Sequence, residues 1–157
     1  MTIKTTWHSK AFCELTTNQL YELLKLRVDV FVVEQTCYYP DLDSNDGCLD
    51  RHSETQHLLG YHNDKLVAYL RILAKGQSYD DYVSIGRVAI NQQARGVGLG
   101  HDLIKQALLL SEKAFPKQAI KISAQQHLSS FYAKHGFKPV STMYLEDGIP
   151  HIAMLKS

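Results

Sequence analysis

Apolar residues recur along the chain at two different periods, which separate predicted helices from predicted strands. The first helical pattern follows Thr16, which can form a capping box with Gln19. We therefore expect the first ordered element to be a helix that begins near Thr16. Its apolar stripe consists of Leu20, Leu23, Leu24, Val28 and Phe31. Arg27 lies at the margin of this stripe, where it either extends past the stripe to solvent or points inward at a carboxylate or a ligand.

Between residues 36 and 55 the periodicity disappears and acidic and amide residues crowd together. They are Asp41, Asp43, Asn45, Asp46 and Asp50. The alternation at its start resembles a calcium-binding loop, but Asp46 stands where that loop needs glycine and His52 where it needs glutamate. We therefore expect a solvated loop from Asp41 to Asp50 near a ligand mouth, and it stays open whether this loop contacts a cationic substrate.

The rest of the chain mixes strand and helix patterns. Strands are predicted at 57–61, 65–73, 82–90, 119–124, 140–144 and 151–155. Helices are predicted from about 97 to 114 and from 128 to 135, where Gly136 supplies the usual C-terminal glycine. Gly86 inside the third strand indicates a bulge or a close backbone approach. The order predicts an α/β (α+β) fold with a mixed sheet.

Composition narrows the function classes. The 157 residues, 45% of them hydrophobic, can build the core of one domain over 1–157. Seventeen basic and sixteen acidic residues leave a net charge of +1, which favours neither nucleic acid nor an anionic membrane. The longest apolar run, at 66–70, is far shorter than the ~20 residues of a membrane helix. Cys13, Cys37 and Cys48 lack metal-type spacing and are expected to be free thiols in a reducing cytoplasm, with no metal bound.

The segment with the clearest chemistry is the glycine-rich turn at 93–100, between a predicted strand and a predicted helix. Backbone N–H groups at a helix start bind anions, and glycines allow a diphosphate to approach the backbone closely. A P-loop would require Gly-Lys-Ser/Thr at its end, whereas Gly100 is followed by His101 and Asp102. A dinucleotide fingerprint would require glycine at position 101 and an acidic residue after the next strand, and neither is present.

A third class fits better. Gln93-x-x-Gly96-x-Gly98 resembles the Gln/Arg-x-x-Gly-x-Gly/Ala signature of GNAT-type N-acetyltransferases, and the Tyr132 segment before Gly136-Phe137 resembles that family's second motif. Further similarity to the ElaA-type branch of the superfamily runs from about residue 15 to 154. The segments that carry it are 26–27, 30–35, 124–128 and 146–152.

The resemblance implies a three-layer fold: a twisted mixed, mostly antiparallel sheet of six to seven strands with helices on both faces and two central strands splayed apart. It implies transfer of an acetyl group from acetyl-CoA to an amine in a ternary complex, with Tyr132 protonating the departing CoA thiolate. The residues implied to bind acetyl-CoA or CoA are Val88, Ala89, Ile90, Gln93, Arg95, Gly96, Val97, Gly98, Leu99, Gly100, His101 and Tyr132.

The acceptor side is less defined by the sequence. A lysine-like amine is mostly protonated at pH 7, so a group or water chain must remove a proton before attack. Glu34, His151 and His127 are the candidates, although Glu34 can instead hold a cationic substrate and His127 can cap a helix. The acceptor is a small-molecule or protein amine. A homodimer is plausible for this superfamily, and a CoA-binding sensor without turnover is the alternative to an enzyme.

Overall fold

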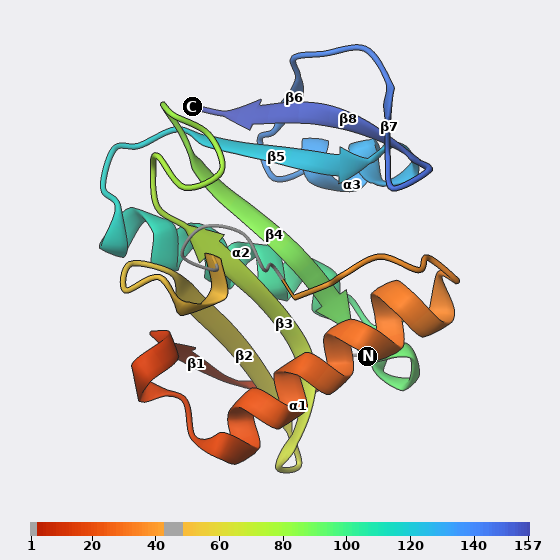
Figure 1. The fold of residues 1–157 in the computed structure, drawn as a ribbon. Helices are drawn as coiled ribbons and strands as arrows, with labels where there is room; N and C mark the ends of the chain where they lie inside the picture. Colours follow the sequence, from red (N-terminus) through yellow and green to blue (C-terminus); the bar gives the residue numbers. More distant parts are fainter. Residues whose placement is uncertain (1–2, 43–48) are drawn as a thin grey trace.

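The computed structural model describes residues 3–42 and 49–157, whose strands form one eight-stranded sheet (Figure 1). The strands are β1 Thr6–Lys10, β2 Gln56–His62, β3 Lys65–Leu73, β4 Val83–Ile90, β5 Ile120–Gln125, β6 Lys138–Pro139, β7 Tyr144–Glu146 and β8 Ile149–Lys156. Their order is β1-β2-β3-β4-β5-β8-β6, with β7 also pairing with β8. Only the β4–β5 pair is parallel. The mixed, mostly antiparallel α/β fold is thus confirmed, with eight strands in place of the six to seven expected.

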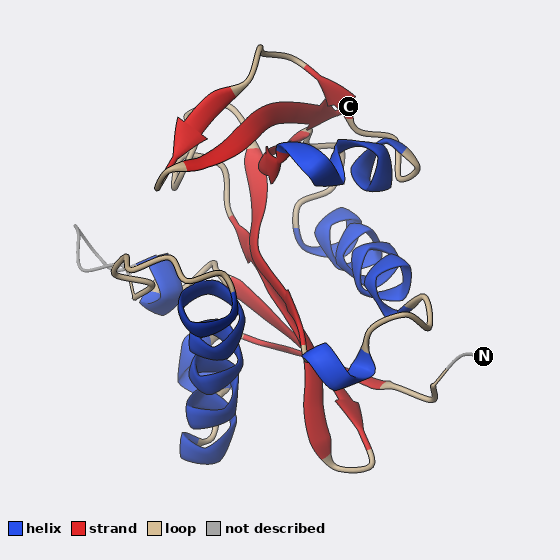
Figure 2. Cartoon of the chain, turned by 90° about the vertical axis from the view of Figure 1, so that its right-hand side faces the viewer, coloured by secondary structure: helices blue, strands red, loops and turns tan. Residues whose placement is uncertain are grey.

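Helices cover both faces of the sheet. Helix α1, Thr17–Arg27, lies on one face, and α2, Leu99–Ala114, and α3, Ser129–Ala133, lie on the other (Figure 2). The predicted capping box is present, since the Gln19 N–H donates to Thr16 Oγ1 at 3.0 Å and the Thr16 N–H to Gln19 Oε1 at 2.9 Å. No helix within the two described ranges is long and apolar enough to cross a membrane.

Each face of the sheet has its own apolar core. On the α1 side Leu23, Leu26 and Val30 pack with side chains of β2, β3 and β4. On the α2 side the larger core contains Leu99, Leu103, Ile104, Ala107, Tyr132 and Phe137. Helix α1 continues without a break into a π-helix, Val28–Glu34. π-helical turns are frequent at functional sites, and residues of this one line the cleft between β4 and β5.

Strand β1 was not expected, because the Thr16 helix was predicted to be the first ordered element. The segment Thr6–Lys10 is mostly polar, and of its residues only Trp7 contributes to a core. It pairs with β2 at the edge of the sheet. A Cβ at Gly60 of β2 would lie 2.6 Å from the Trp7 ring, so glycine is required where the indole crosses. A polar edge strand with one core side chain lacks the alternation of apolar and polar residues by which strands are predicted.

The strand predicted at 140–144 is wrong in its bounds. Strand β6 ends at Pro139 and β7 begins at Tyr144. The Val140 N–H still donates to the Ala153 carbonyl of β8 at 2.8 Å, and the regular pairing is interrupted after it, at residues 141–143. In this interval the N–H of Ala153 donates to Ser141 Oγ at 3.0 Å. The serine side chain therefore takes the place of a backbone acceptor.

Gly86 marks a bulge in β4. A bulge was one of the two features predicted from this glycine, the other being a close backbone approach. Ala89 pairs with Tyr69, but Gly86 pairs with Arg71, so β4 has one more residue in this interval than β3. Arg87 adopts a left-handed conformation with φ of +54°. Since such a conformation is costly for a residue with a Cβ, the bulge needs strong surrounding contacts.

Candidate active site

A cleft opens where β4 and β5 separate. These neighbours are parallel and pair only through Val83 with Ile120 and Ser84 with Lys121 (Figure 1). Beyond Ser84, β4 continues along β3 while β5 diverges from it and pairs with β8. The splay expected from the resemblance is therefore present.

Two adjoining cavities occupy this region. The first, which we call the turn-side cavity, has a volume of about 320 Å³ and is lined by Ile90, Arg95 and Gly100 among others. The second, which we call the polar cavity, has a volume of about 260 Å³ and is lined by Ser123, Glu146 and His151 among others. Phe31, Gln35, Val88, Gln125, Leu128 and Tyr132 line both. The cavities are thus two halves of one cleft that meet at Tyr132.

The glycine-rich turn lies at the turn-side end of this cleft. Gly96 and Gly98 have φ values of +85° and +80°, which residues with a Cβ rarely adopt. The first backbone hydrogen bond of α2 runs from the Asp102 N–H to the Gly98 carbonyl at 3.2 Å. The N–H groups of Leu99, Gly100 and His101 precede it and point out of the helix start. Together with the positive end of the helix dipole they form an anion site.

Of the other residues expected to bind the cofactor, some line the cavity and others pack in the core or point away from it. A Cβ at Gly100 would lie 3.3 Å from Ile90 Cδ1 and 3.4 Å from the Phe131 ring, so the cavity wall is tight there. Val97 packs against the core, and Ala89 is 1% exposed within the α1-side core. The His101 ring turns away to His135, with 2.8 Å between its Nδ1 and His135 Nε2. Burial, then His101 and Lys105, lower the pKa of His135.

Arg95 and Glu34 contact each other across the turn-side cavity. The guanidinium donates two hydrogen bonds to the Glu34 carboxylate, at 2.5 and 2.9 Å, and two more to the Ile90 carbonyl. Arg95 was expected to add charge for a diphosphate, but its charge is balanced by Glu34 here. An anion here would therefore depend mainly on the backbone N–H groups at the start of α2. The Gln93 N–H donates elsewhere, to Asn91 Oδ1 at 2.9 Å.

Tyr132 stands between the two cavities. It is 7% exposed, and burial raises its pKa to about 12. Its ring packs edge-on against Phe131 and Phe137. A phenol with this pKa keeps its proton throughout the neutral range. Helix α3 therefore presents a protonated hydroxyl-bearing side chain at the junction of the cleft.

The three candidates for the acceptor-side base do not come together. Glu34 lies in the turn-side cavity, bound to Arg95, and the exposed His127 lines the same half of the cleft. Of the three, only His151 lines the polar cavity. Glu146, which the sequence interpretation did not include among the candidates, lies beside it, with 3.5 Å between Glu146 Oε2 and His151 Nε2.

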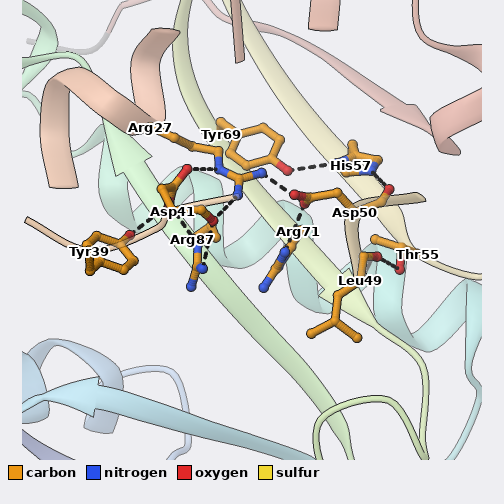
Figure 3. A network of polar contacts seen from close by, with 10 residues as sticks. All are labelled: Arg27, Tyr39, Asp41, Leu49, Asp50, Thr55, His57, Tyr69, Arg71 and Arg87. Carbon is orange, nitrogen blue, oxygen red and sulfur yellow. Dashed lines mark hydrogen bonds and ion pairs between the residues drawn. The ribbon is translucent and has the colours of Figure 1, made fainter. Parts of the chain in front are cut away.

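A buried polar network joins Asp41 and Asp50 to three arginines (Figure 3), and Arg71 and Arg87 of this network also line the polar cavity. Arg27 is 0% exposed and donates from Nε to Asp41 Oδ2 at 2.9 Å and from Nη1 to Asp50 Oδ1 at 2.8 Å. Arg87 reaches the same Asp41 from the β4 bulge, and Arg71 of β3 reaches Asp50. Of the two orientations left open for Arg27, the inward one toward carboxylates is therefore confirmed.

The expected solvated loop is wrong for its two ends, since Asp41 and Asp50 are buried. Three positions of the calcium-loop comparison lie outside the described residues, namely Asp43, Asn45 and Asp46. Cys48 also lies outside them, and the other two cysteines, Cys13 and Cys37, are free thiols. His57 completes the network with 2.7 Å between Nδ1 and the Tyr69 hydroxyl and 2.8 Å between Nε2 and the Asp50 carbonyl. Burial lowers the pKa of His57 and outweighs the opposing effect of Asp50, so its ring is neutral.

The fold and the cleft are those of an acyltransferase that takes its acyl group from coenzyme A. The acetyltransferase (GNAT) domain family matches residues 36–157, and the chain belongs to this family. It is 42% identical to the protein ElaA of Escherichia coli K12 over 150 residues, which are 96% of this chain and 95% of ElaA.

Solved structures agree with this assignment. An acyl-CoA N-acyltransferase from Pseudomonas aeruginosa superposes with a TM-score of 0.91 at 42% identity. The crystal structure of Escherichia coli ElaA superposes with a TM-score of 0.90 at 40% identity. In both, the match covers 98% of this chain and 100% of the other. The similarity thus extends over nearly the whole chain.

Proposed function

We propose that this protein transfers an acetyl group from acetyl-CoA to an amine by direct attack in a ternary complex. The observation that carries the proposal is the position of Tyr132 between a cavity at a helix N-terminus and a polar cavity with a carboxylate and an imidazole. The first cavity suits an anionic thioester donor, and the second suits a cationic acceptor. One cleft therefore brings the two reactants to the same side chain.

The donor would be held mainly by backbone groups. The N–H groups of Leu99, Gly100 and His101 would bind the diphosphate, and the edge of β4 at Val88, freed by the splay, would pair with the pantetheine arm. The Ile90 carbonyl, which accepts from Arg95, would have to exchange those contacts to join this pairing. The tight wall at Gly100 and the left-handed glycines before it support this fit. Acetyl-CoA supplies an activated thioester. A backbone N–H near Val88 would polarise its carbonyl, as oxyanion holes do.

Tyr132 would act as the general acid. A free thiol has a pKa of about 8.5. Burial holds the pKa of Tyr132 at about 12, so the phenol is protonated whenever the thiolate leaves. Because a thiolate is already a fair leaving group, the gain from protonation is moderate. Tyr132 is therefore expected to accelerate the reaction without being indispensable.

Replacing Tyr132 with phenylalanine is expected to lower kcat by roughly tenfold to a few hundredfold, while the Kd for acetyl-CoA changes little. The substitution removes the acidic proton and leaves the buried ring in place. Steady-state thiol release measures kcat, and calorimetry measures Kd. Tyr21→Phe, on the exposed side of α1 where Tyr21 is 71% exposed, is the control and should match wild type. Unchanged kcat in Tyr132→Phe would remove Tyr132 from the mechanism.

The proposed function is tested by binding and turnover measured separately. Acetyl-CoA, CoA, a longer acyl-CoA and NAD are compared by thermal shift, and thiol release is then followed across a panel of amines. We expect stabilisation by acetyl-CoA and CoA, and amine-dependent thiol release. Binding without release from any amine would identify a CoA-binding sensor. Stabilisation by NAD alone would contradict the proposal. Faster turnover with the longer acyl-CoA would show that the transferred group is longer than acetyl.

A further inference from the structure

Four polar side chains gather on the cleft face of the C-terminal strands. His151 of β8 pairs across the sheet with Tyr144 of β7 and with Gln125 of β5, and Ser123 lies two residues before Gln125. Residues two apart on a strand share a face, so Ser123, Tyr144 and Glu146 lie on the same face as His151. Ser123, Glu146 and His151 all line the polar cavity.

The hydrogen-bond directions within this group are determined by chemistry. Ser123 Oγ donates to Glu146 Oε1 at 3.2 Å. A serine hydroxyl has a single proton, so the 2.5 Å contact between Ser123 Oγ and the Tyr144 hydroxyl is donated by the tyrosine. The chain Tyr144 to Ser123 to Glu146 therefore ends on an ionised carboxylate, which leaves its second oxygen, Oε2, toward His151.

His151 has its tautomer fixed in the same way. Its Nδ1 lies 2.7 Å from the Ile149 carbonyl oxygen, which can only accept, so Nδ1 carries a proton. The neutral ring then has its lone pair on Nε2, 3.5 Å from Glu146 Oε2. Two acceptors that face each other at this distance need a donor between them. An ammonium group, which has three N–H donors, satisfies both.

Resting on the proposed function, we infer that Glu146 and His151 bind the ammonium group of the acceptor and remove its proton. The nitrogen gives one proton to His151 Nε2 and attacks the thioester carbonyl carbon. The carbon–sulfur bond breaks with its electrons on sulfur, which takes the Tyr132 proton. The nitrogen loses a second proton, which returns to Tyr132 through water, and His151 releases its own to solvent. R–NH₃⁺ and acetyl-CoA thus give R–NH–acetyl, CoA thiol and one H⁺.

Other charged and titratable groups face the same space. Tyr144 stacks against the His151 ring with 6.2 Å between centroids, and Asp147 follows Glu146 in the turn. Groups from other elements also line the cavity, namely Cys37, Tyr39, Arg71, Tyr79 and Arg87. Both arginines form ion pairs with buried carboxylates, Arg71 with Asp50 and Arg87 with Asp41. Burial, and then Tyr144 and Glu146, raise the pKa of Tyr79, so it stays neutral. The carboxylates nearest to His151 thus carry the negative charge that attracts a cationic amine.

The tautomer is tested without any acceptor. Nitrogen-15 chemical shifts of the His151 ring, assigned by comparison with His151→Asn, are measured above pH 8. The expected result is a proton on Nδ1 and none on Nε2. In Glu146→Gln the proton is expected to stay on Nδ1, because the Ile149 carbonyl that accepts it is unchanged. A proton on Nε2 in the neutral ring would overturn the assignment, since that nitrogen could not then accept one.

Kinetics provide the second test, with ethanolamine as an ammonium acceptor and methoxyamine as an acceptor that is neutral at pH 7. Glu146→Gln is expected to raise KM for ethanolamine about tenfold or more. His151→Asn is expected to lower kcat about 100-fold with ethanolamine but less than about tenfold with methoxyamine. In His151→Asn the ethanolamine rate should depend more steeply on pH than in the wild type, because only the amine that is already neutral in solution can then attack.

Matched controls are Glu54→Gln and His8→Gln, which change exposed residues away from the cleft. If the wild type transfers acetyl groups and Glu146→Gln and His151→Asn behave like these controls, the ammonium site is overturned and the proposed function stands. If the wild type binds acetyl-CoA and acetylates neither acceptor nor any other amine, the proposed function fails and the assignment fails with it.

Discussion

Replacing Arg27 with methionine is expected to lower the free energy of unfolding by about 3–5 kcal/mol at pH 7, the usual effect of breaking a buried ion pair from one side. Methionine fills much of the same volume but cannot donate to Asp41 or Asp50. Both carboxylates then stay buried with one fewer cation each. Since domains of this size are stable by about 5–15 kcal/mol, the loss is a large part of the total.

The pH dependence distinguishes lost charge pairing from lost packing. Burial would raise the pKa of Asp50, but Arg27 and then Arg71 outweigh it and hold that pKa below its usual range. A lowered pKa contributes stability above the unfolded value of about 3.9 and loses it as pH falls through the lower folded value. In Arg27→Met this pKa rises, so protonation relieves the buried charge, and the deficit should shrink between pH 7 and about pH 4.

Urea denaturation at pH 7, 5.5 and 4 measures both effects. Arg51→Met is the matched control, because Arg51 is exposed and follows Asp50 directly, and it should stay within about 0.5 kcal/mol of wild type. A deficit in Arg27→Met that is the same at all three pH values would mean that packing, and not charge pairing, is what Arg27 contributes.

The sequence was most informative where a feature depends on neighbours along the chain. The capping box at Thr16 and the neighbouring strands predicted at 57–61 and 65–73 depend on residues close together in the chain, and the structure contains them. The backbone N–H groups proposed to bind an anion also belong to the first turn of one helix, so the glycine-rich turn before it is visible in the sequence.

Contacts between segments that are distant in the chain could not be predicted from local sequence patterns. Arg27 looked marginal because its partners, Asp41 and Asp50, lie 14 and 23 residues away, in a segment without periodicity. Acidic residues in such a segment are ordinarily solvated, and the burial of Asp41 and Asp50 follows from the three arginines that contact them. Strand β1 was missed for a related reason, since its single core side chain, Trp7, finds its place on Gly60.

The acceptor side of the cleft was only partly predictable. His151 was one of three candidate bases and lines the polar cavity, whereas Glu146, the residue before the turn at Asp147 and Gly148, was not among them. That turn brings Glu146 back beside His151, while the β5–β8 pairing adds Ser123 from far upstream. Glu34 was another candidate base, and its ion pair with Arg95, 61 residues away, places it in the turn-side cavity and not beside His151.

Replacing Gly98 with aspartate is expected to weaken acetyl-CoA binding on the order of 100-fold, because it places a negative charge where the diphosphate would lie. Gly98 caps α2 with φ of +80°, and a Cβ built there meets no atom within 4 Å. Aspartate and asparagine tolerate the left-handed region better than other residues. A negative charge at a helix N-terminus is also stabilising, so the variant should fold.

Gly98→Asn is the matched control, since it has nearly the same shape and no charge, and it should lose less than about tenfold in affinity. Calorimetry at two salt concentrations separates the two causes. Salt screens charge repulsion, so the difference between the two variants should narrow at high ionic strength, while the steric part common to both should not change. Equal losses in aspartate and asparagine at low salt would show that the α2 N-terminus is not where the diphosphate binds. The donor site would then have to be sought elsewhere along the cleft.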